Sequence, residues 1–168
     1  MGPIVKSDEV QAERTRYAVA GWGEGELWTE HDVVLANDFA FSLPGETSTQ
    51  SDGFAAELVG LVTAFLRGEP VELADVPLDL SATTPFERAV LDALRSIPRG
   101  EVVTYGELAG LAGYPGAGRA VGTVCAKNRF AFLVPCHRVV AAGGIGSYGS
   151  AGVAVKRRLL ALEGVDLQ

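Results

Sequence analysis

Residues 104–126, TYGELAGLAGYPGAGRAVGTVCA, hold the pattern that decides the fold of the second half of this chain. Thr104 and Glu107 have the spacing of a capping box, which predicts the start of a short helix running through Leu111. A glycine-rich turn over 113–118 follows, and a further helix is expected after it. Two short helices joined by a glycine-containing turn are typical of a helix-turn-helix motif, whose second helix is the recognition element.

The helix expected after this turn is made largely of small residues. Gly118, Ala120 and Gly122 weaken a helix, but they permit close approach to the backbone of a partner. Tight packing between helices explains the same composition. Arg119 is expected to point away from the apolar face of this helix, which includes Val121.

The first half of the chain has the pattern of a small α/β unit. Two runs, 17–20 and 26–30, flank three glycines and predict a β-hairpin, with a third strand expected over 31–36. Apolar residues over 54–65 then recur at helical spacing, and the helix is expected to end at Gly68.

Two further helices are expected on either side of the central motif. The first begins at Pro85, behind a capping box formed by Thr84 and Glu87. The last spans 152–163 and carries three successive basic residues that begin at Lys156.

Charge is distributed unevenly between the two halves. Residues 1–80 contain four Lys/Arg and fifteen Asp/Glu, whereas residues 81–168 contain ten Lys/Arg and six Asp/Glu. This asymmetry favours a C-terminal half that binds a polyanion, although ordinary solvated surface gives the same balance. An extended connection over 71–80 also divides the chain, so we expect an N-terminal domain over 1–80 and a C-terminal domain over 81–168.

One of the two cysteines is adjacent to one of the two histidines, at Cys136-His137. A thiol is nucleophilic only as thiolate, and a nearby imidazole can accept its proton. Free cysteine is also often buried, which gives the pair a purely structural explanation. In an extended segment the two side chains would point apart, which disfavours a direct hydrogen bond between them. The glycine-rich stretch over 141–152 either covers a pocket or is only a connection.

Composition indicates the compartment. No run of about 20 apolar residues occurs, so we expect no membrane-spanning helix. Residues 1–10 lack the apolar block of a secretory signal, and two cysteines are then expected to be free thiols in the cytoplasm. No cysteine and histidine spacing is typical of a zinc site, so no metal is expected.

In order and spacing these motifs resemble those of the O6-alkylguanine-DNA alkyltransferases, the methylated-DNA–protein-cysteine methyltransferases. The resemblance covers about half of the chain, residues 79–164. It implies a ribonuclease-H-like α/β N-terminal domain and a mainly α C-terminal domain with a helix-turn-helix of winged-helix type. The matching residues are Thr84-Pro85-Phe86, Ile97-Pro98-Arg99-Gly100, Thr104-Tyr105-Gly106-Glu107, Gly118-Arg119-Ala120-Val121-Gly122, Pro135-Cys136-His137-Arg138-Val139-Val140, and Lys156 through Gly164.

The resemblance implies direct-reversal DNA repair without a cofactor. Such proteins bind duplex DNA and flip an O6-alkylated guanine out of the stack, because a stacked base hides the substituent. The alkyl group then moves, once per molecule, to a cysteine. Here the implied acceptor is Cys136, with His137 as the base acting through a bridging water and Glu163 orienting that base. Whether O4-alkylthymine is also a substrate stays open.

The resemblance also implies the contacts to double-stranded DNA and to the flipped base. Arg119 would fill the gap left by the flipped nucleotide, while Tyr105 would crowd the phosphate and donate a proton as guanine leaves. The protein is expected to act as a monomer. The other implied DNA-binding residues are Thr104, Gly118, Ala120 and Gly122, and the implied substrate pocket consists of Tyr148, Ser147, Gly149, Ser150, Val139, Cys125 and Asn128.

One departure and two alternatives stand beside this interpretation. Many members have Pro-x-Pro after the position of Asn128, where this chain has Arg129-Phe130-Ala131, which leaves the shape of the pocket open. A helix-turn-helix regulator or lesion binder would hold DNA without transferring a group. A cysteine hydrolase would use the same Cys-His pair but turn over repeatedly.

Overall fold

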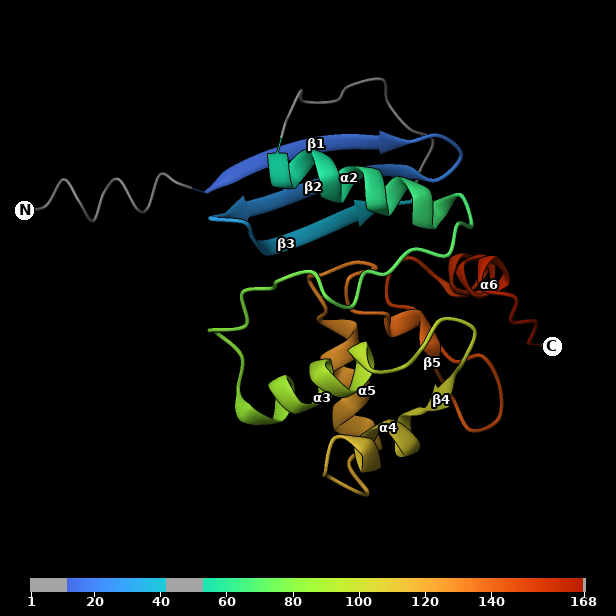
Figure 1. The fold of residues 1–168 in the computed structure, drawn as a ribbon. Helices are drawn as coiled ribbons and strands as arrows, with labels where there is room; N and C mark the ends of the chain where they lie inside the picture. Colours follow the sequence, from blue (N-terminus) through green and yellow to red (C-terminus); the bar gives the residue numbers. More distant parts are fainter. Residues whose placement is uncertain (1–11, 42–52, 168) are drawn as a thin grey trace, which may run out of the picture.

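A three-stranded antiparallel sheet forms the first layer of the protein, in a computed structural model that describes residues 12–41 and 53–167 (Figure 1). Its strands are β1 (Glu13–Val19), β2 (Gly23–Glu30) and β3 (Val33–Ala40), paired in chain order. The predicted hairpin and third strand are therefore confirmed. The segment 1–10, in which no secretory signal is expected, lies outside the described residues.

The turn between β2 and β3 corrects one boundary. His31 and Asp32 have φ values of 51° and 61°, so both are in the left-handed conformation that a two-residue hairpin turn of type I′ requires. The third strand therefore begins at Val33, and the prediction that it begins at His31 is wrong. The alternation of apolar and polar residues in the sequence did not reveal this turn, because neither of its two central residues is a glycine.

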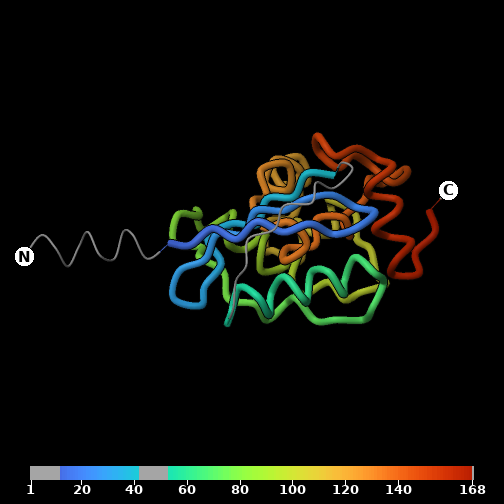
Figure 2. The backbone as a smooth tube through the Cα atoms, turned by 90° about the horizontal axis from the view of Figure 1, so that it is seen from above, coloured from blue at the N-terminus to red at the C-terminus, as the bar shows by residue number. Residues whose placement is uncertain are grey.

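Helix α2 (Gly53–Leu66) covers one face of the sheet, as Figures 1 and 2 show. Its apolar side is the one predicted from the helical spacing, and Leu58, Val62 and Phe65 are buried. Trp22 fixes the end of this helix to the first hairpin, because its indole nitrogen donates to the carbonyl oxygen of Leu66 at 2.8 Å.

The C-terminal half contains short helices around a pair of two-residue strands. Both predicted capping boxes are present: Thr84 accepts a hydrogen bond from the amide of Glu87, and Thr104 accepts one from the amide of Glu107. The two helices of the predicted helix-turn-helix, α4 and α5, contact each other. The elements are α3 (Pro85–Arg95), β4 (Val103–Thr104), α4 (Tyr105–Leu111), α5 (Gly118–Ala126), the 3-10 helix η1 (Cys136–Arg138), β5 (Val139–Val140) and α6 (Val153–Leu162).

Residues 129–131, where the expected Pro-x-Pro is absent, join the two halves of the chain by hydrogen bonds. The amide of Asn37 in β3 donates to the carbonyl oxygen of Arg129 at 2.8 Å, and the amide of Ala131 donates to the carbonyl oxygen of Asn37 at 3.0 Å. The guanidinium of Arg129 donates to the carbonyl oxygens of Leu35 and Asp79. This stretch thus pairs with the edge of the sheet, a role that proline could not fill at the amide of Ala131.

At the other end of the molecule, α6 lies beside the hairpin between β1 and β2 (Figure 2). The guanidinium of Arg158 stacks 3.5 Å from the ring centroid of Trp22 and donates to the carbonyl oxygen of Gly21 at 2.8 Å. Among residues 12–41 and 53–167, no helix has the length and apolarity needed to cross a membrane.

Gly25 of β2 lies against the ring of Tyr17, and this close packing gives a stability prediction. A Cβ at Gly25 would lie 2.3 Å from the ring of Tyr17, whose hydroxyl donates to Asn37 Oδ1 at 2.7 Å. We expect Gly25→Ala to lower the free energy of unfolding by about 1–3 kcal/mol, because an overpacked core must shift. Thermal and urea denaturation measure this change.

Gly60 provides the matched control, since it is exposed on α2 and a Cβ at this position would meet no atom within 4 Å. Gly60→Ala should raise the stability by about 0.5–1 kcal/mol, because alanine restricts the unfolded chain and favours helix. Equal effects of the two substitutions would show that Tyr17 does not constrain β2.

Candidate active site

Cys136 begins the 3-10 helix η1 and is not part of an extended strand. Its amide donates to the carbonyl oxygen of Val134 at 2.8 Å, and the amide of Arg138 donates to the carbonyl oxygen of Pro135 at 2.9 Å. With three residues per turn, successive side chains of a 3-10 helix point about 120° apart, so Cys136 and His137 face different directions. The thiol faces a cavity of about 170 Å³, although Cys136 is only 8 % exposed.

The cavity brings together residues from four parts of the chain. Tyr105 reaches it from α4, Gly122 and Cys125 from α5, and the loop after β5 supplies Tyr148. Val139 is not among the lining residues: its side chain is fully buried, and its backbone pairs with that of Val103. The other lining residues predicted from the sequence are Asn128, Ser147, Gly149 and Ser150.

The N-terminal half also lines this cavity, which the sequence did not indicate. Asn37, Asp38 and Phe39 of β3 and the following Phe41 contribute to the wall. The ring of Phe41 packs edge-on against that of Tyr148, with centroids 6.5 Å apart. Strand alternation could identify the core face of β3, but not that its end meets a loop more than a hundred residues later.

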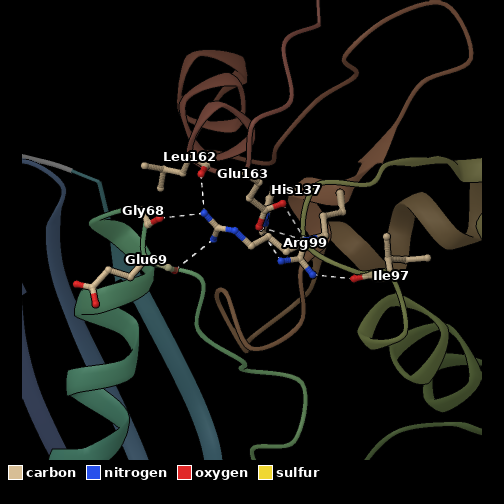
Figure 3. A network of polar contacts seen from close by, with 8 residues as sticks. Gly68, Glu69, Ile97, Arg99, His137, Leu162 and Glu163 are labelled. Carbon is tan, nitrogen blue, oxygen red and sulfur yellow. Dashed lines mark hydrogen bonds and ion pairs between the residues drawn. The ribbon is translucent and has the colours of Figure 1, made fainter.

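His137 lies behind Cys136 in a buried ionic network (Figure 3). Its Nε2 is 3.0 Å from Glu163 Oε2, and the two side chains are 1 % and 0 % exposed. Burial lowers the pKa of His137, so the imidazole is neutral at neutral pH and able to accept a proton. Its Nδ1 is buried and has no hydrogen-bond partner among the described residues.

Arg138 completes the network and was not predicted as a site residue. Its Nη2 donates to Glu163 Oε2 at 2.6 Å, its Nε donates to Oε1 at 3.0 Å, and its Nη1 donates to the carbonyl oxygen of Ile97 at 2.7 Å. Burial acts to raise the pKa of Glu163, but the hydrogen bonds from His137 and Arg138 outweigh it and lower that pKa to about 2. Glu163, which follows the last residue of α6, is therefore a buried anion with two partners.

Lys156 lies beside the cavity, although its place at the start of three successive basic helix residues suggested nothing of this. The residue is fully buried, and its Nζ donates to the carbonyl oxygen of Ser147 at 3.0 Å. The ammonium lies 5.9 Å from the ring centroid of Tyr105. Burial lowers the pKa of Lys156 to about 8, while burial raises the pKa of Tyr105, so the phenol stays protonated.

The two thiols line the same cavity, and each affects the pKa of the other. The hydrogen bond to Cys125, and then burial, raise the pKa of Cys136 well above its ordinary value. The side chain of Asn128 and the charge of Lys156 act in the opposite direction. In the resting state the Cys136 sulfur is thus a thiol, which a base must deprotonate before it can attack.

A shallow, open hollow of about 590 Å³ adjoins the cavity on the outer side of α5. It shares Tyr105, Gly122 and Ser147 with the cavity, and Arg119 lines it with an exposed side chain. Ala120 is exposed but lines neither space.

The small residues of α5 have different surroundings, and the helix-packing role that the sequence allowed is confirmed at Gly118. A Cβ on Gly118 would lie 3.4 Å from the amide nitrogen of Gly106, so Gly118 permits close packing of α5 on α4. Gly122 instead opens the surface beside the ring of Tyr105. Thr104 caps α4, and its side chain is half-buried.

The fold and the site define a mixed α/β protein whose cysteine opens into a pocket lined by the packed helices α4 and α5, next to a buried histidine–carboxylate pair. Residues 85–165 match the model of the 6-O-methylguanine DNA methyltransferase DNA-binding domain. A methylated-DNA–protein-cysteine methyltransferase of Methanopyrus kandleri is 43 % identical over 73 % of this chain and 92 % of its own length. One from Mycobacterium tuberculosis is 45 % identical over 79 % of this chain and 82 % of its own length.

Solved structures agree with this match. The crystal structure of Mycobacterium tuberculosis O6-methylguanine methyltransferase superposes with a TM-score of 0.75 at 33 % identity, over 90 % of this chain and 92 % of that one. A second structure, of the M. tuberculosis protein in complex with DNA, superposes with a TM-score of 0.74 at 35 % identity, over 88 % of this chain and 90 % of that one. The chain belongs to the methylated-DNA–protein-cysteine methyltransferase family.

The depressed pKa of Glu163 gives a prediction for acid stability. A carboxyl whose folded pKa lies below its unfolded value stabilises the protein above about pH 4.5, and this stability is lost as pH falls toward about 2. Glu163→Gln should remove this acid-dependent loss of stability. At neutral pH the variant should be less stable by about 3 kcal/mol, because Arg138 is left without its anionic partner. Chemical denaturation from pH 7 to pH 2 measures both effects.

Glu101→Gln is the matched control, because Glu101 is an exposed carboxylate in the same half of the chain. Its stability at neutral pH should stay within about 0.5 kcal/mol of the wild type. If Glu163→Gln unfolds with the same acid dependence as the wild type, the network does not hold the carboxylate ionised.

Proposed function

We propose that this protein repairs DNA by direct reversal, moving the alkyl group of O6-alkylguanine in duplex DNA onto the sulfur of Cys136. The observation that carries the proposal is the position of that sulfur. It faces a cavity shared by both helices of the helix-turn-helix, while the next residue, His137, is hydrogen-bonded to a buried carboxylate. The names of the relatives describe the same transfer, and one structural neighbour is bound to DNA.

The chemistry begins with removal of the thiol proton. Nε2 of His137 donates to Glu163, which leaves Nδ1 as the acceptor, and this atom has no partner among the described residues. A buried nitrogen in that position is normally satisfied by water. We place a water there, which passes the proton of Cys136 to Nδ1 while Glu163 stabilises the resulting imidazolium.

The thiolate then attacks the alkyl carbon, so a sulfur–carbon bond forms as the oxygen–carbon bond at O6 breaks. The leaving guanine takes a proton, which we assign to the phenol of Tyr105; burial keeps this group protonated. The thioether product is not hydrolysed by water, so each molecule acts once. The residues assigned to hold the base are Tyr148, Ser147, Gly149, Ser150, Cys125 and Asn128, all of which line the cavity.

Duplex DNA is assigned to the outer face of α5. The hollow lined by Arg119 and Gly122 leads directly to Tyr105 at the mouth of the cavity. We assign Arg119 to the gap left by the flipped nucleotide, with Thr104, Gly118 and Ala120 as neighbouring DNA contacts. This arrangement supports extrusion of the base into the cavity, for which unstacking costs a few kcal/mol.

The finer organisation follows the same proposal. We assign residues 1–80 to a structural domain of ribonuclease-H-like type, supported by the antiparallel sheet with α2 across one face. Residues 81–168 form the DNA-binding and acceptor domain, with a helix-turn-helix of winged-helix type. We further propose a cytoplasmic protein that acts as a monomer and needs no metal or cofactor.

The central test is stoichiometric methyl transfer. Incubation of the reduced protein with duplex DNA containing O6-methylguanine should replace one hydrogen by one methyl group, and peptide mass spectrometry should locate it on Cys136. Cys136→Ser should bind the duplex but remain unmodified, because a neutral hydroxyl is a far weaker nucleophile than a thiolate. DNA binding by the wild type without any adduct would favour a lesion binder, and repeated product release would favour a hydrolase.

Arg119 provides a test of base flipping. Arg119→Ala should slow methyl transfer at limiting protein by about tenfold or more, since loss of even 1.4 kcal/mol of support for the extruded base changes an equilibrium tenfold. Arg14→Ala removes the same charge from the outer face of the sheet and should leave the rate unchanged. Identical rates for both variants would remove Arg119 from the flipping step.

A further inference from the structure

Two thiols face the cavity, but the proposed transfer uses only one. Cys125 near the end of α5 and Cys136 at the start of η1 both line it, and they are the only cysteines of the chain. Both are reduced. The mechanism leaves Cys125 without a chemical role.

The two thiols line the same cavity and differ electrically. Cys136 donates a hydrogen bond to Cys125, which lowers the pKa of Cys125. The charge of Lys156 acts to lower the pKa of both thiols, although the net shift at Cys136 is upward. Of the two thiols, Cys125 therefore loses its proton more readily. A thiolate beside a second thiol is the arrangement found in redox-sensitive cysteines.

We propose that Cys125 and Cys136 form a reversible intramolecular disulfide when a peroxide enters the cavity. The inference rests on the proposed function only for its consequence, the loss of the acceptor sulfur. A disulfide requires the two sulfurs to approach to about 2.05 Å, and both residues already line a single cavity of about 170 Å³. The cavity gives a molecule as small as hydrogen peroxide a path to both of them.

The chemistry is balanced by one peroxide. The Cys125 thiolate attacks one peroxide oxygen, the oxygen–oxygen bond breaks, and hydroxide leaves and takes up the proton already lost by that thiol. Cys136 then attacks the sulfur of the resulting sulfenic acid, and the sulfur–sulfur bond forms as a second water leaves. Two thiols give up two electrons, and one peroxide becomes two waters.

The disulfide would protect a sulfur that can be used only once. Oxidation of a lone thiol beyond sulfenic acid gives sulfinic and sulfonic acids, which thiol reductants do not restore. A disulfide stops this sequence at its first stage. While it persists, Cys136 cannot accept an alkyl group, and a cytoplasmic dithiol can return it to the active form by exchange.

The test uses the full-length protein, reduced and then treated with hydrogen peroxide before excess peroxide is removed. The wild type should remain monomeric, lose the mass of two hydrogens and yield a single Cys125–Cys136 peptide pair. Its methyl transfer should be lost and then recovered after dithiothreitol. In Cys125→Ala, Cys136 should instead gain oxygen atoms, and transfer, expressed relative to that variant's own reduced sample, should not recover.

Thr123→Ala is the matched control, because Thr123 lies on the same helix with an exposed side chain. It should form the disulfide as the wild type does. Oxygen additions on wild-type Cys136 to the same extent as in Cys125→Ala, without the disulfide peptide, would overturn the inference. Mass spectrometry detects the disulfide without any measurement of methyl transfer. A protein that forms the disulfide but transfers no methyl group in its reduced state would therefore contradict the proposed function and not the disulfide.

Discussion

The buried carboxylate of Glu163 is the constraint on which the arrangement of the site depends. A carboxylate with no exposed side-chain area requires partners, because an unpaired charge away from water is far too costly. His137 and Arg138 are those partners, and Arg138 also holds the carbonyl oxygen of Ile97. One anion thus fixes the end of α6, the 3-10 helix and the turn after α3 in a single geometry.

A second arginine extends this constraint to the N-terminal half. Arg99 donates to the carbonyl oxygens of Gly68 and Leu162, at 3.0 Å and 2.7 Å, and so joins the segment after α2 to the end of α6 (Figure 3). The buried ion pairs of Glu163 with His137 and Arg138 add little net stability, because desolvation offsets their attraction. Their value here is positional: they orient the imidazole so that only Nδ1 faces away from Glu163.

The sequence predicted what local chemistry controls and missed what distant contacts create. The capping boxes at Thr84 and Thr104 were predictable because each joins residues three apart along the chain. The buried positions of Lys156 and Arg138 were not, since charged side chains on a helix or beside a strand are usually solvated. Lys156 is buried because its amine meets the carbonyl oxygen of Ser147, on a loop whose path only the tertiary structure defines.

Cys136 has to react as a thiolate and yet is held as a protonated thiol at rest. A good nucleophile at neutral pH is a thiolate, yet contact with Cys125 and burial keep this thiol protonated at rest. For a sulfur that reacts only once, a high resting pKa limits loss to stray electrophiles, whose attack depends on the thiolate fraction. The base is already in place, since burial keeps His137 neutral and Glu163 stands ready to stabilise its charged form. Reactivity then depends on transfer of the Cys136 proton to this base, which the proposed water carries to Nδ1 of His137.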